Sequence, residues 1–151
     1  VFHDVLVVLG IFSLLYKVMP FNMEIDQAFI AAILTVIGYS LNDTVVVFDR
    51  IREYVNEHSS WSFGEIVNSA LNSTISRTVN TSLTTLVVLL AIFIFGGESI
   101  RGFMFALIVG VIVGTYSSLF IATPVMFDSV KKKSSIEKKK KPQTEEEAAT
   151  A

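Results

Sequence analysis

The residue best suited to chemistry is Asp43, a single carboxylate inside an otherwise uncharged run over residues 28–48. At 1.5 Å per residue, this run is long enough to cross a bilayer, which needs about 20 residues. Placing an ionised carboxylate there costs at least about 2.5–3.5 kcal/mol, so such residues usually face the interior of a bundle. A carboxylate held between burial and a cation is suited to reversible protonation. The plainer alternative is an aspartate that only pins a neighbouring helix.

Arg77 is the natural partner of Asp43, because it begins the next long apolar segment at the same level of the expected bundle. Placement of a basic residue at the cytoplasmic boundary is an open alternative explanation for it. Polar side chains follow at three- and four-residue spacing, and they could hold water, relay protons or bond neighbouring helices: Asn80, Thr81, Thr84 and Thr85. Tyr39, Ser40 and Asn42 adjoin Asp43 on its own helix and complete the supporting polar set.

Four apolar segments position these residues, and they predict helices over about residues 1–18, 25–50, 78–96 and 102–128. Residues 62–76 are amphipathic and follow a capping serine, Ser62, so they predict a helix on the cytoplasmic membrane surface. An amphipathic helix packed on a small cap domain is the alternative. The predicted fold is therefore all-α: a polytopic membrane bundle of four transmembrane helices with one interfacial helix. Residues 1–130 form this membrane domain, and residues 131–151 are expected to be a disordered charged tail.

Small side chains recur every four residues along the last segment. This pattern lets a second helix approach closely along the whole length, and it could serve as a sliding surface during a conformational change. Pro124 is expected to loosen the same helix near its end. The stripe consists of Gly102, Ala106, Gly110, Gly114, Ser118 and Ala122.

Composition and charge fix the class of protein and its expected orientation. Apolar residues make up 52% of the chain and charged residues 17%, below the roughly 25% of soluble domains. Most of the 12 Lys and Arg residues lie between the second and third segments or in the tail, so both regions are expected to be cytoplasmic. The turns at residues 19–24 and 96–101 then face outward. The chain begins inside an apolar run without Met, so it is expected to be a piece of a longer protein.

Several classes of enzyme are excluded by what the sequence lacks. It has no Cys, no metalloprotease His-Glu-x-x-His motif and no phosphate-binding Gly-Lys-Ser/Thr loop. An intramembrane aspartyl protease needs two facing carboxylates, and we expect only Asp43 to lie deep in a span. His3 and Asp4 are expected at the cytoplasmic boundary as interface residues, and Asp49 on a solvated face. We therefore expect no enzyme, cofactor, metal or nucleic-acid partner, and an ion gradient as the source of energy.

Three stretches resemble the SecF family of bacterial protein-export membrane proteins. They are residues 38–53 (GYSLNDTVVVFDRIRE), residues 77–82 (RTVNTS) and the glycine-rich residues 95–124 of the last helix. The resemblance implies a fold related to resistance-nodulation-division transporters, with this chain holding the last four of six membrane helices. Asp43 and Arg77 match the membrane aspartate and the following arginine through which the family is coupled to protons.

The same resemblance implies the partners and the location. The family works with SecD, as a separate subunit or a fused half, beside the SecYEG channel, and indirectly with SecA and the preprotein. It lies among the lipids of the bacterial cytoplasmic (inner) membrane and uses the proton gradient to promote export. Two alternatives stay open: a proton-driven exporter of small molecules or lipids in the same superfamily, and a passive assembly subunit with a structural Asp43.

Overall fold

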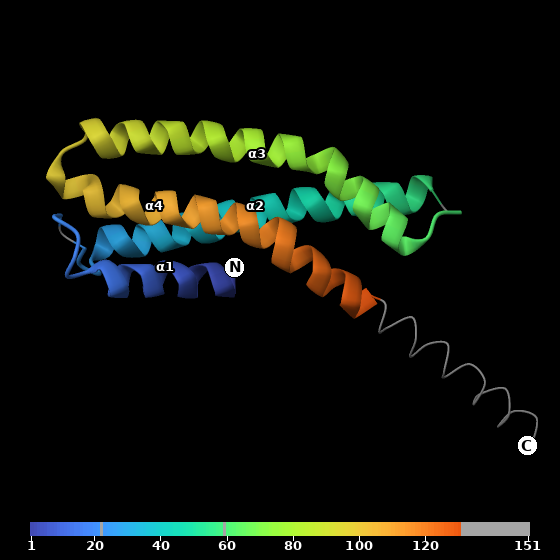
Figure 1. The fold of residues 1–151 in the computed structure, drawn as a ribbon, viewed down its shortest axis with the longest axis horizontal. Helices are drawn as coiled ribbons and strands as arrows, with labels where there is room; N and C mark the ends of the chain where they lie inside the picture. Colours follow the sequence, from blue (N-terminus) through green and yellow to red (C-terminus); the bar gives the residue numbers. More distant parts are fainter. Residues whose placement is uncertain (22, 59, 131–151) are drawn as a thin grey trace, which may run out of the picture.

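The computed structural model describes residues 1–21, 23–58 and 60–130, and every regular element within these ranges is helical (Figure 1). The elements are α1 (Phe2–Leu15), α2 (Gln27–Glu57), α3 (Phe63–Phe95), α4 (Glu98–Ser117) and a π-helical turn, η1 (Ser118–Ala122). Helix continues after η1, so the last segment runs without a break over Glu98–Val130. The all-helical prediction is confirmed for this part of the chain. The predicted tail, residues 131–151, lies outside the described residues.

Within the described residues, three helices are long and apolar enough to cross a membrane: Gln27–Glu57, Phe63–Phe95 and Glu98–Val130. The fourth predicted span corresponds to α1, a shorter apolar helix of 14 residues that begins at the second residue of the given sequence. It ends at Leu15, whose carbonyl accepts hydrogen bonds from the backbone N–H groups of Val18 and Met19. This turn comes just before Pro20, so the chain leaves the helix earlier than residue 18. In Figure 1, α1 begins about midway along the bundle.

A separate surface helix over residues 62–76 is not present, because these residues form the beginning of α3. No Gly or Pro interrupts the sequence between this part and the apolar segment that follows. The polar side chains where a break was expected find hydrogen-bond partners within the helix: the Thr74 hydroxyl, for example, donates to the carbonyl of Ala70 at 2.8 Å. The apolar side of the amphipathic part is buried against protein: Ile66, Val67 and Ala70 share a cluster with α2 and η1 residues.

Side-chain caps set where α2 and α3 begin. The Asp26 carboxylate accepts a hydrogen bond from the backbone N–H of Phe29 at 2.8 Å. Ser62 and Glu65 form a reciprocal capping box, which confirms the predicted role of Ser62. These caps fix the register in which α2 and α3 present their side chains to α4.

The last segment is the centre of the bundle. In its most apolar 18-residue window 56% of the residues are buried, against 28% for α2 and 11% for α3. The outer faces of α2 and α3 are therefore largely apolar and exposed, as expected for helices that face lipid or another protein chain. After η1 the last segment bends (Figure 1), and its end packs against the start of α3, where the rings of Phe63 and Phe127 stack with centroids 5.5 Å apart.

The core consists of two apolar clusters separated by a polar layer. One cluster includes Val8, Phe12, Phe29, Val36 and Leu107. The other includes Val47, Ile51, Ile66, Ala70 and Leu119. Between the two along α2, α3 and α4 lie buried polar residues, which we call the polar layer: Ser40, Asp43, Thr74, Thr78, Ser82, Ser117 and Ser118, joined by Asp4 from α1.

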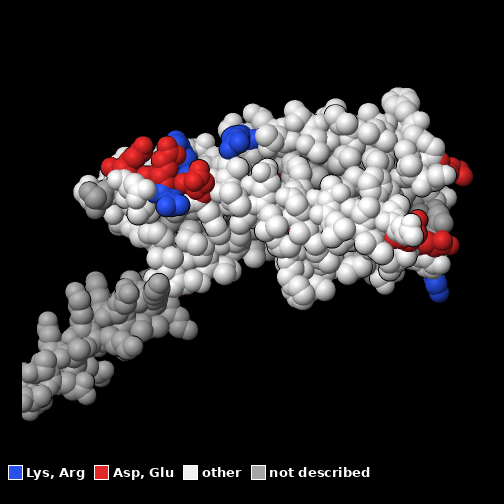
Figure 2. Space-filling model, turned by 180° about the vertical axis from the view of Figure 1, so that it is seen from behind, with Lys and Arg blue, Asp and Glu red and all other residues white. Residues whose placement is uncertain are grey.

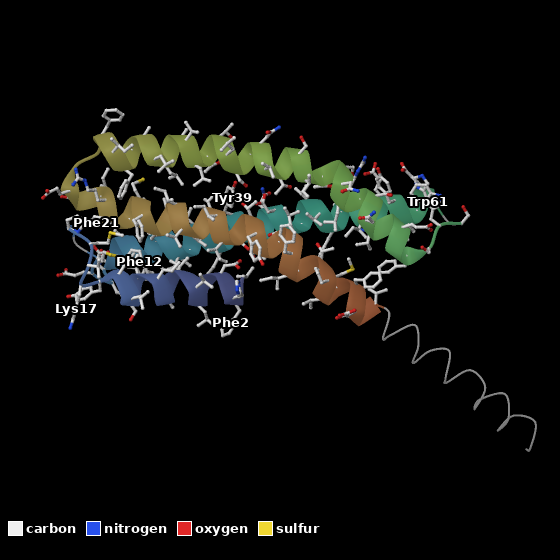
Figure 3. The ribbon with its side chains drawn as sticks, in the orientation of Figure 1. Phe2, Phe12, Lys17, Phe21, Tyr39 and Trp61 are labelled. Carbon is white, nitrogen blue, oxygen red and sulfur yellow. The ribbon has the colours of Figure 1, made fainter. Side chains whose placement is uncertain are left out.

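Charged side chains gather at the two ends of the molecule and leave a broad uncharged surface between them (Figure 2). Lys17 and Trp61 mark the opposite ends in Figure 3. This distribution matches a bundle whose middle lies in hydrocarbon, because aromatic and basic residues favour the two membrane interfaces.

Candidate functional site

Asp43 lies on the buried face of α2, where an apolar residue would otherwise be expected. This face repeats every three or four residues, which is the spacing of one side of a helix. The Asp43 residue is only 5% exposed. Its burial follows from its register in the repeat Phe29, Ala32, Val36, Ser40, Asp43, Val47 and Ile51.

Asp43 and Arg77 line the same small cavity between α2 and α3, with a volume of about 80 Å³. No ion pair joins the two side chains within 4.0 Å in the described part of the chain. The cavity is large enough for water molecules, since one requires about 10–15 Å³ of such space. Arg77 can therefore act on Asp43 through its charge and through water, without a fixed salt bridge.

Hydroxyl groups connect Asp43 to two other helices. The Thr115 hydroxyl of α4 lies 3.5 Å from Asp43 Oδ2 and 2.6 Å from the Ser82 hydroxyl of α3. The Tyr39 hydroxyl donates in turn to Ser82 at 3.2 Å. Figure 3 shows Tyr39 at mid-length of the bundle, between α2 and α3. Because a hydroxyl can donate or accept, this series of hydroxyls can provide a hydrogen-bond partner for Asp43 in either protonation state.

A second and larger cavity, about 360 Å³, adjoins this site on the side of the α2–α3 connection. Asp49, Arg50, Glu53 and Ser73 give it a charged and polar lining. Val46 and Arg77 line both cavities, so they separate the small one from the large one. Arg77 thus stands between Asp43 and a polar vestibule. Asp49 is exposed, in line with its expected solvated position.

Only some of the predicted supporting polar residues line the Asp43 cavity. Tyr39, Asn42, Thr81 and Thr85 line the Asp43 cavity. Asn80 and Thr84 are exposed, and the Thr84 hydroxyl bonds only to carbonyls of its own helix. The buried polar face of α3 is instead a four-residue repeat that lies two positions before Asn80 and Thr84: Thr74, Thr78 and Ser82.

Ser40 does not face Asp43. Its hydroxyl donates to Asp4 Oδ2 of α1 at 2.6 Å. Asp4 is 1% exposed, so it is not the interface residue that we expected from the sequence. The expectation that only Asp43 would be buried inside the bundle is also wrong. Asp4 is buried because α1 packs against α2, where Ser40 donates to its carboxylate.

The small-residue stripe of α4 faces α2. A Cβ atom added to Gly110 would overlap the Val36 side chain, and one added to Gly114 would lie 3.3 Å from Ser40 Cβ. Ser118 is fully buried, and its hydroxyl lies 2.9 Å from that of Thr44. Among the others, Ala106 is fully buried, whereas Gly102 and Ala122 are half-buried.

Three polar residues of the site were not predicted: Thr78, which lines the Asp43 cavity, and Ser82 and Thr115, which belong to the hydroxyl chain. Ser82 lies four residues after Thr78 in a polar repeat, whereas Thr115 lies four residues after the apolar Val111. The signal for Ser82 was available, because a polar residue every four positions from Thr74 marks a buried face. Thr115 adjoins the stripe and does not belong to it, so its contact with Asp43 depends on how α4 crosses α2.

A family model, curated relatives and solved structures all match this chain to the same protein family. Residues 1–140 match the family model described as protein export membrane protein SecD/SecF, C-terminal. A protein translocase subunit SecF from Rhodothermus marinus is 62% identical over 127 residues, which cover 84% of this chain and 41% of that protein. The SecF subunit of Haemophilus influenzae is 48% identical over 126 residues, covering 83% of this chain and 37% of that one.

Two crystal structures of SecDF share the fold. One, in a form described as super-membrane-facing, has a TM-score of 0.82 and 42% identity and covers 91% of this chain. The other, a translocon-associated membrane protein from Thermus, has a TM-score of 0.74 and 43% identity and covers 85%. This chain spans 18% and 17% of those two proteins, and about two fifths of the SecF relatives. By family model, sequence identity and fold, the chain belongs to the SecD/SecF family of protein-export membrane proteins.

Proposed function

We propose that this chain is the C-terminal membrane part of a SecF subunit, or of the SecF half of a fused SecDF, which uses the proton motive force to promote preprotein translocation. The observation that carries this proposal is Asp43, a buried carboxylate that shares a small cavity with Arg77 and is linked by hydroxyls to α3 and α4. An intramembrane carboxylate in this setting is typical of a proton-binding site.

The relatives favour protein export over the alternative, a proton-driven exporter of small molecules or lipids. The proteins compared above are named as translocase subunits, and the two similar structures are of SecDF. The expected partners are SecD, the SecYEG channel and, indirectly, SecA and the preprotein. The exposed apolar faces of α2 and α3 support contact with lipid or with SecD helices.

The site can change its hydrogen bonds with protonation. Ionised Asp43 accepts from Thr115 and is attracted by the Arg77 charge across the small cavity, which favours proton release. Protonated Asp43 becomes a hydrogen-bond donor and loses that attraction, so α3 is held less firmly against α2. The two states differ in what they bind, and protonation can therefore shift the population of two arrangements of the bundle.

The polar vestibule indicates on which side of the membrane Asp43 would exchange protons. With the positive-inside orientation, the cavity lined by Asp49, Arg50 and Glu53 opens toward the cytoplasm. Protons that leave Asp43 would pass Arg77 to reach it. We place the protein in the bacterial inner membrane with its C-terminus in the cytoplasm, in agreement with this path.

The test is export into membrane vesicles by the full-length complex, measured with and without an imposed proton gradient. Asp43→Asn keeps the size and hydrogen bonding of the side chain but cannot titrate. It should assemble with SecD and lose the gradient-dependent part of export. Arg77→Ala should lose it or move its pH optimum, whereas Asp49→Asn, on the exposed side of the vestibule, should be nearly silent. An Asp43→Asn complex that assembles and responds fully to the gradient would show that Asp43 is structural.

A further inference from the structure

We propose that the outward end of the bundle binds one glycerophospholipid, with the headgroup phosphate against Arg101 and an acyl chain in an apolar pocket beside it. The preferred headgroup carries an ammonium as well as the phosphate. This site lies at the opposite end of the bundle from the polar vestibule and takes no part in proton exchange (Figure 1). Its place in the outer leaflet follows from the orientation given above.

The pocket is formed where three segments meet: the α1–α2 connection, the end of α3 and the start of α4. Its volume is about 500 Å³, which is within the usual range of about 300–1,000 Å³ for sites that bind small molecules. Each segment contributes one phenylalanine to its wall. The ring centroid of Phe21 lies 5.6 Å from that of Phe93 and 5.7 Å from that of Phe105. These edge-on contacts hold the aromatic wall in place before any ligand binds.

The pocket extends from the membrane interface into the hydrocarbon. Arg101 and Ile108 both line it, and Ile108 lies seven residues further along α4, which is about 10 Å at 1.5 Å per residue. Leu90 and Ile94 of α3 also line it and are 44% and 63% exposed, so the pocket is open on the lipid-facing side. All of its lining residues except Arg101 are apolar. A cation at the outer end with apolar side chains below it matches a headgroup followed by an acyl chain.

Arg101 supplies the charge that a phosphate would require. The residue is half-buried, and within residues 1–21, 23–58 and 60–130 no carboxylate lies within 4.0 Å of its guanidinium. A guanidinium can bind a phosphate through two parallel N–H···O bonds. Of the 12 Lys and Arg residues, only Lys17 and Arg101 lie on the outward side, where basic residues are normally scarce. A lipid phosphate at the outer interface explains why Arg101 is there.

Acidic groups near Arg101 discriminate between headgroups. Glu98 precedes Arg101 by about one turn of α4, and together with Glu24 and Asp26 it lines a separate cavity of about 70 Å³. These carboxylates repel a second negative charge on a headgroup and attract an ammonium beside the phosphate. Phosphatidylethanolamine therefore complements the charges on both sides of this turn, whereas phosphatidylglycerol complements only Arg101.

The dimensions of the pocket favour a lipid over a helix of a partner protein. A helix with its side chains is about 10–12 Å wide, so it could cover the mouth of the pocket and insert only single side chains. It would also have to bring an acidic side chain to Arg101 at the edge of the hydrocarbon, which is costly. An acyl chain is narrow enough to enter along the length of the pocket, and its burial against the phenylalanine rings is favourable.

The experiment uses the full-length complex of SecF with SecD, reconstituted with a phosphatidylethanolamine that carries a photoreactive diazirine on one acyl chain. After washing with lipid-free detergent and irradiation, peptide mass spectrometry locates the lipid adducts. Adducts at Phe105 or Ile108 should persist through the wash, whereas adducts at Val87, an exposed residue of α3, should be lost with loosely held lipid. Arg101→Gln should reduce the persistent adducts by about tenfold. Lys17→Gln, which removes the other outward cation, should leave them unchanged.

A second variant tests the apolar part of the site with Arg101 intact. Leu90→Trp should fill the pocket from its exposed wall and prevent adducts at Ile108. Native protein without persistent adducts in the pocket would overturn the proposal, because another protein segment would then occupy it. Equal labelling of native protein and Arg101→Gln, or loss of the adducts on adding inorganic phosphate alone, would also overturn it.

The choice of headgroup is tested with the same photoreactive chain on phosphatidylglycerol. We expect weaker labelling of the pocket than with phosphatidylethanolamine, and equal or stronger labelling would overturn the preference for an ammonium. None of these measurements depends on proton coupling. They therefore remain decisive if the Asp43→Asn complex responds fully to the gradient and the proposed function fails.

Discussion

Thr115 shows how the environment of Asp43 is arranged at the level of single atoms. Its hydroxyl lies 3.5 Å from the carboxylate, 2.6 Å from the Ser82 hydroxyl and 2.8 Å from the carbonyl of Val111. One rotating group is therefore shared among a titratable residue, a neighbouring helix and its own backbone. Protonation of Asp43 changes which of these contacts is favoured.

The first prediction concerns this hydroxyl. Thr115→Val keeps the shape of the side chain and removes the hydroxyl, so it should lower stability by about 0.5–1.5 kcal/mol and weaken the gradient-dependent part of export. Thr84→Val is the matched control, because the Thr84 hydroxyl bonds only to carbonyls of its own helix. Thermal unfolding in detergent and vesicle export measure the two effects. Identical export by both variants would argue against a role for Thr115.

At the same scale, the sequence singled out two residues that line one cavity, Asp43 and Arg77, but not all of the residues around them. Asp43 and Arg77 could be singled out because a charge beside or within an apolar run is unusual. Their environment depends on the rotation of α3 and on the crossing of α2 and α4. The predicted polar stripe on α3 included Asn80 and Thr84, which lie two positions after the buried Thr78 and Ser82. The burial of Asp4 depends on where α1 lies along the bundle, which local sequence does not encode.

At the scale of elements, the α2–α4 crossing decides the geometry of the site. Gly110 and Gly114 let α4 approach α2 at Val36 and Ser40. The same crossing brings Thr115 to Asp43 and Ser118 to Thr44. Close packing of small residues thus places the polar groups, and the Pro124 that follows lacks the N–H that would continue a regular α-helix.

The second prediction tests this crossing. Gly110→Ala should destabilise the bundle by about 1–3 kcal/mol, because the new methyl group overlaps Val36. Gly38→Ala, in α2, meets nothing within 4 Å and should be neutral or stabilising by up to about 1 kcal/mol. Thermal unfolding in detergent compares the two. The double variant Gly110→Ala with Val36→Ala should regain part of the lost stability, and equal effects of both glycine changes would remove the significance of the contact.

The elements also show which boundaries local sequence could define. The start of α3 was predictable from Ser62 and Glu65, since a capping box is a short sequence signal. The joining of the amphipathic part to the span was not, because the polar residues around Arg77 suggested a break. In the structure, threonine hydroxyls bond to carbonyls of the same helix there, and the helix continues.

At the scale of the whole molecule, the distribution of charged and apolar surface indicates which direction would run across a membrane. Charged side chains lie at both ends, and the middle is uncharged on the face seen in Figure 2. α4 lies in the centre, and α3 exposes nearly all of its apolar outer face. This asymmetry supports a bundle completed by lipid and by helices of a second chain or domain.

The third prediction concerns orientation in the membrane. In a cysteine-free full-length protein, Ser60→Cys and Ser129→Cys should resist an impermeant thiol reagent in intact cells, because basic residues concentrate on their side. Ser99→Cys, at the α3–α4 turn, should react. All three positions are exposed, so access depends only on the side of the membrane. Labelling of Ser129→Cys from outside would reverse the assigned topology.

Two threonines beside the polar layer affect how fast the helices can move past one another. Thr44 and Thr115 each keep a bond to a carbonyl of their own helix, at 2.9 and 2.8 Å, while they also contact a hydroxyl on another helix. When the helices shift, the hydroxyls of Thr44 and Thr115 keep these carbonyl acceptors, so the transition state for the shift contains no unpaired hydroxyl donor at these two positions. Rearrangement at this depth can therefore have a low barrier and be repeated many times, without the loosening of the two apolar clusters that local unfolding would require.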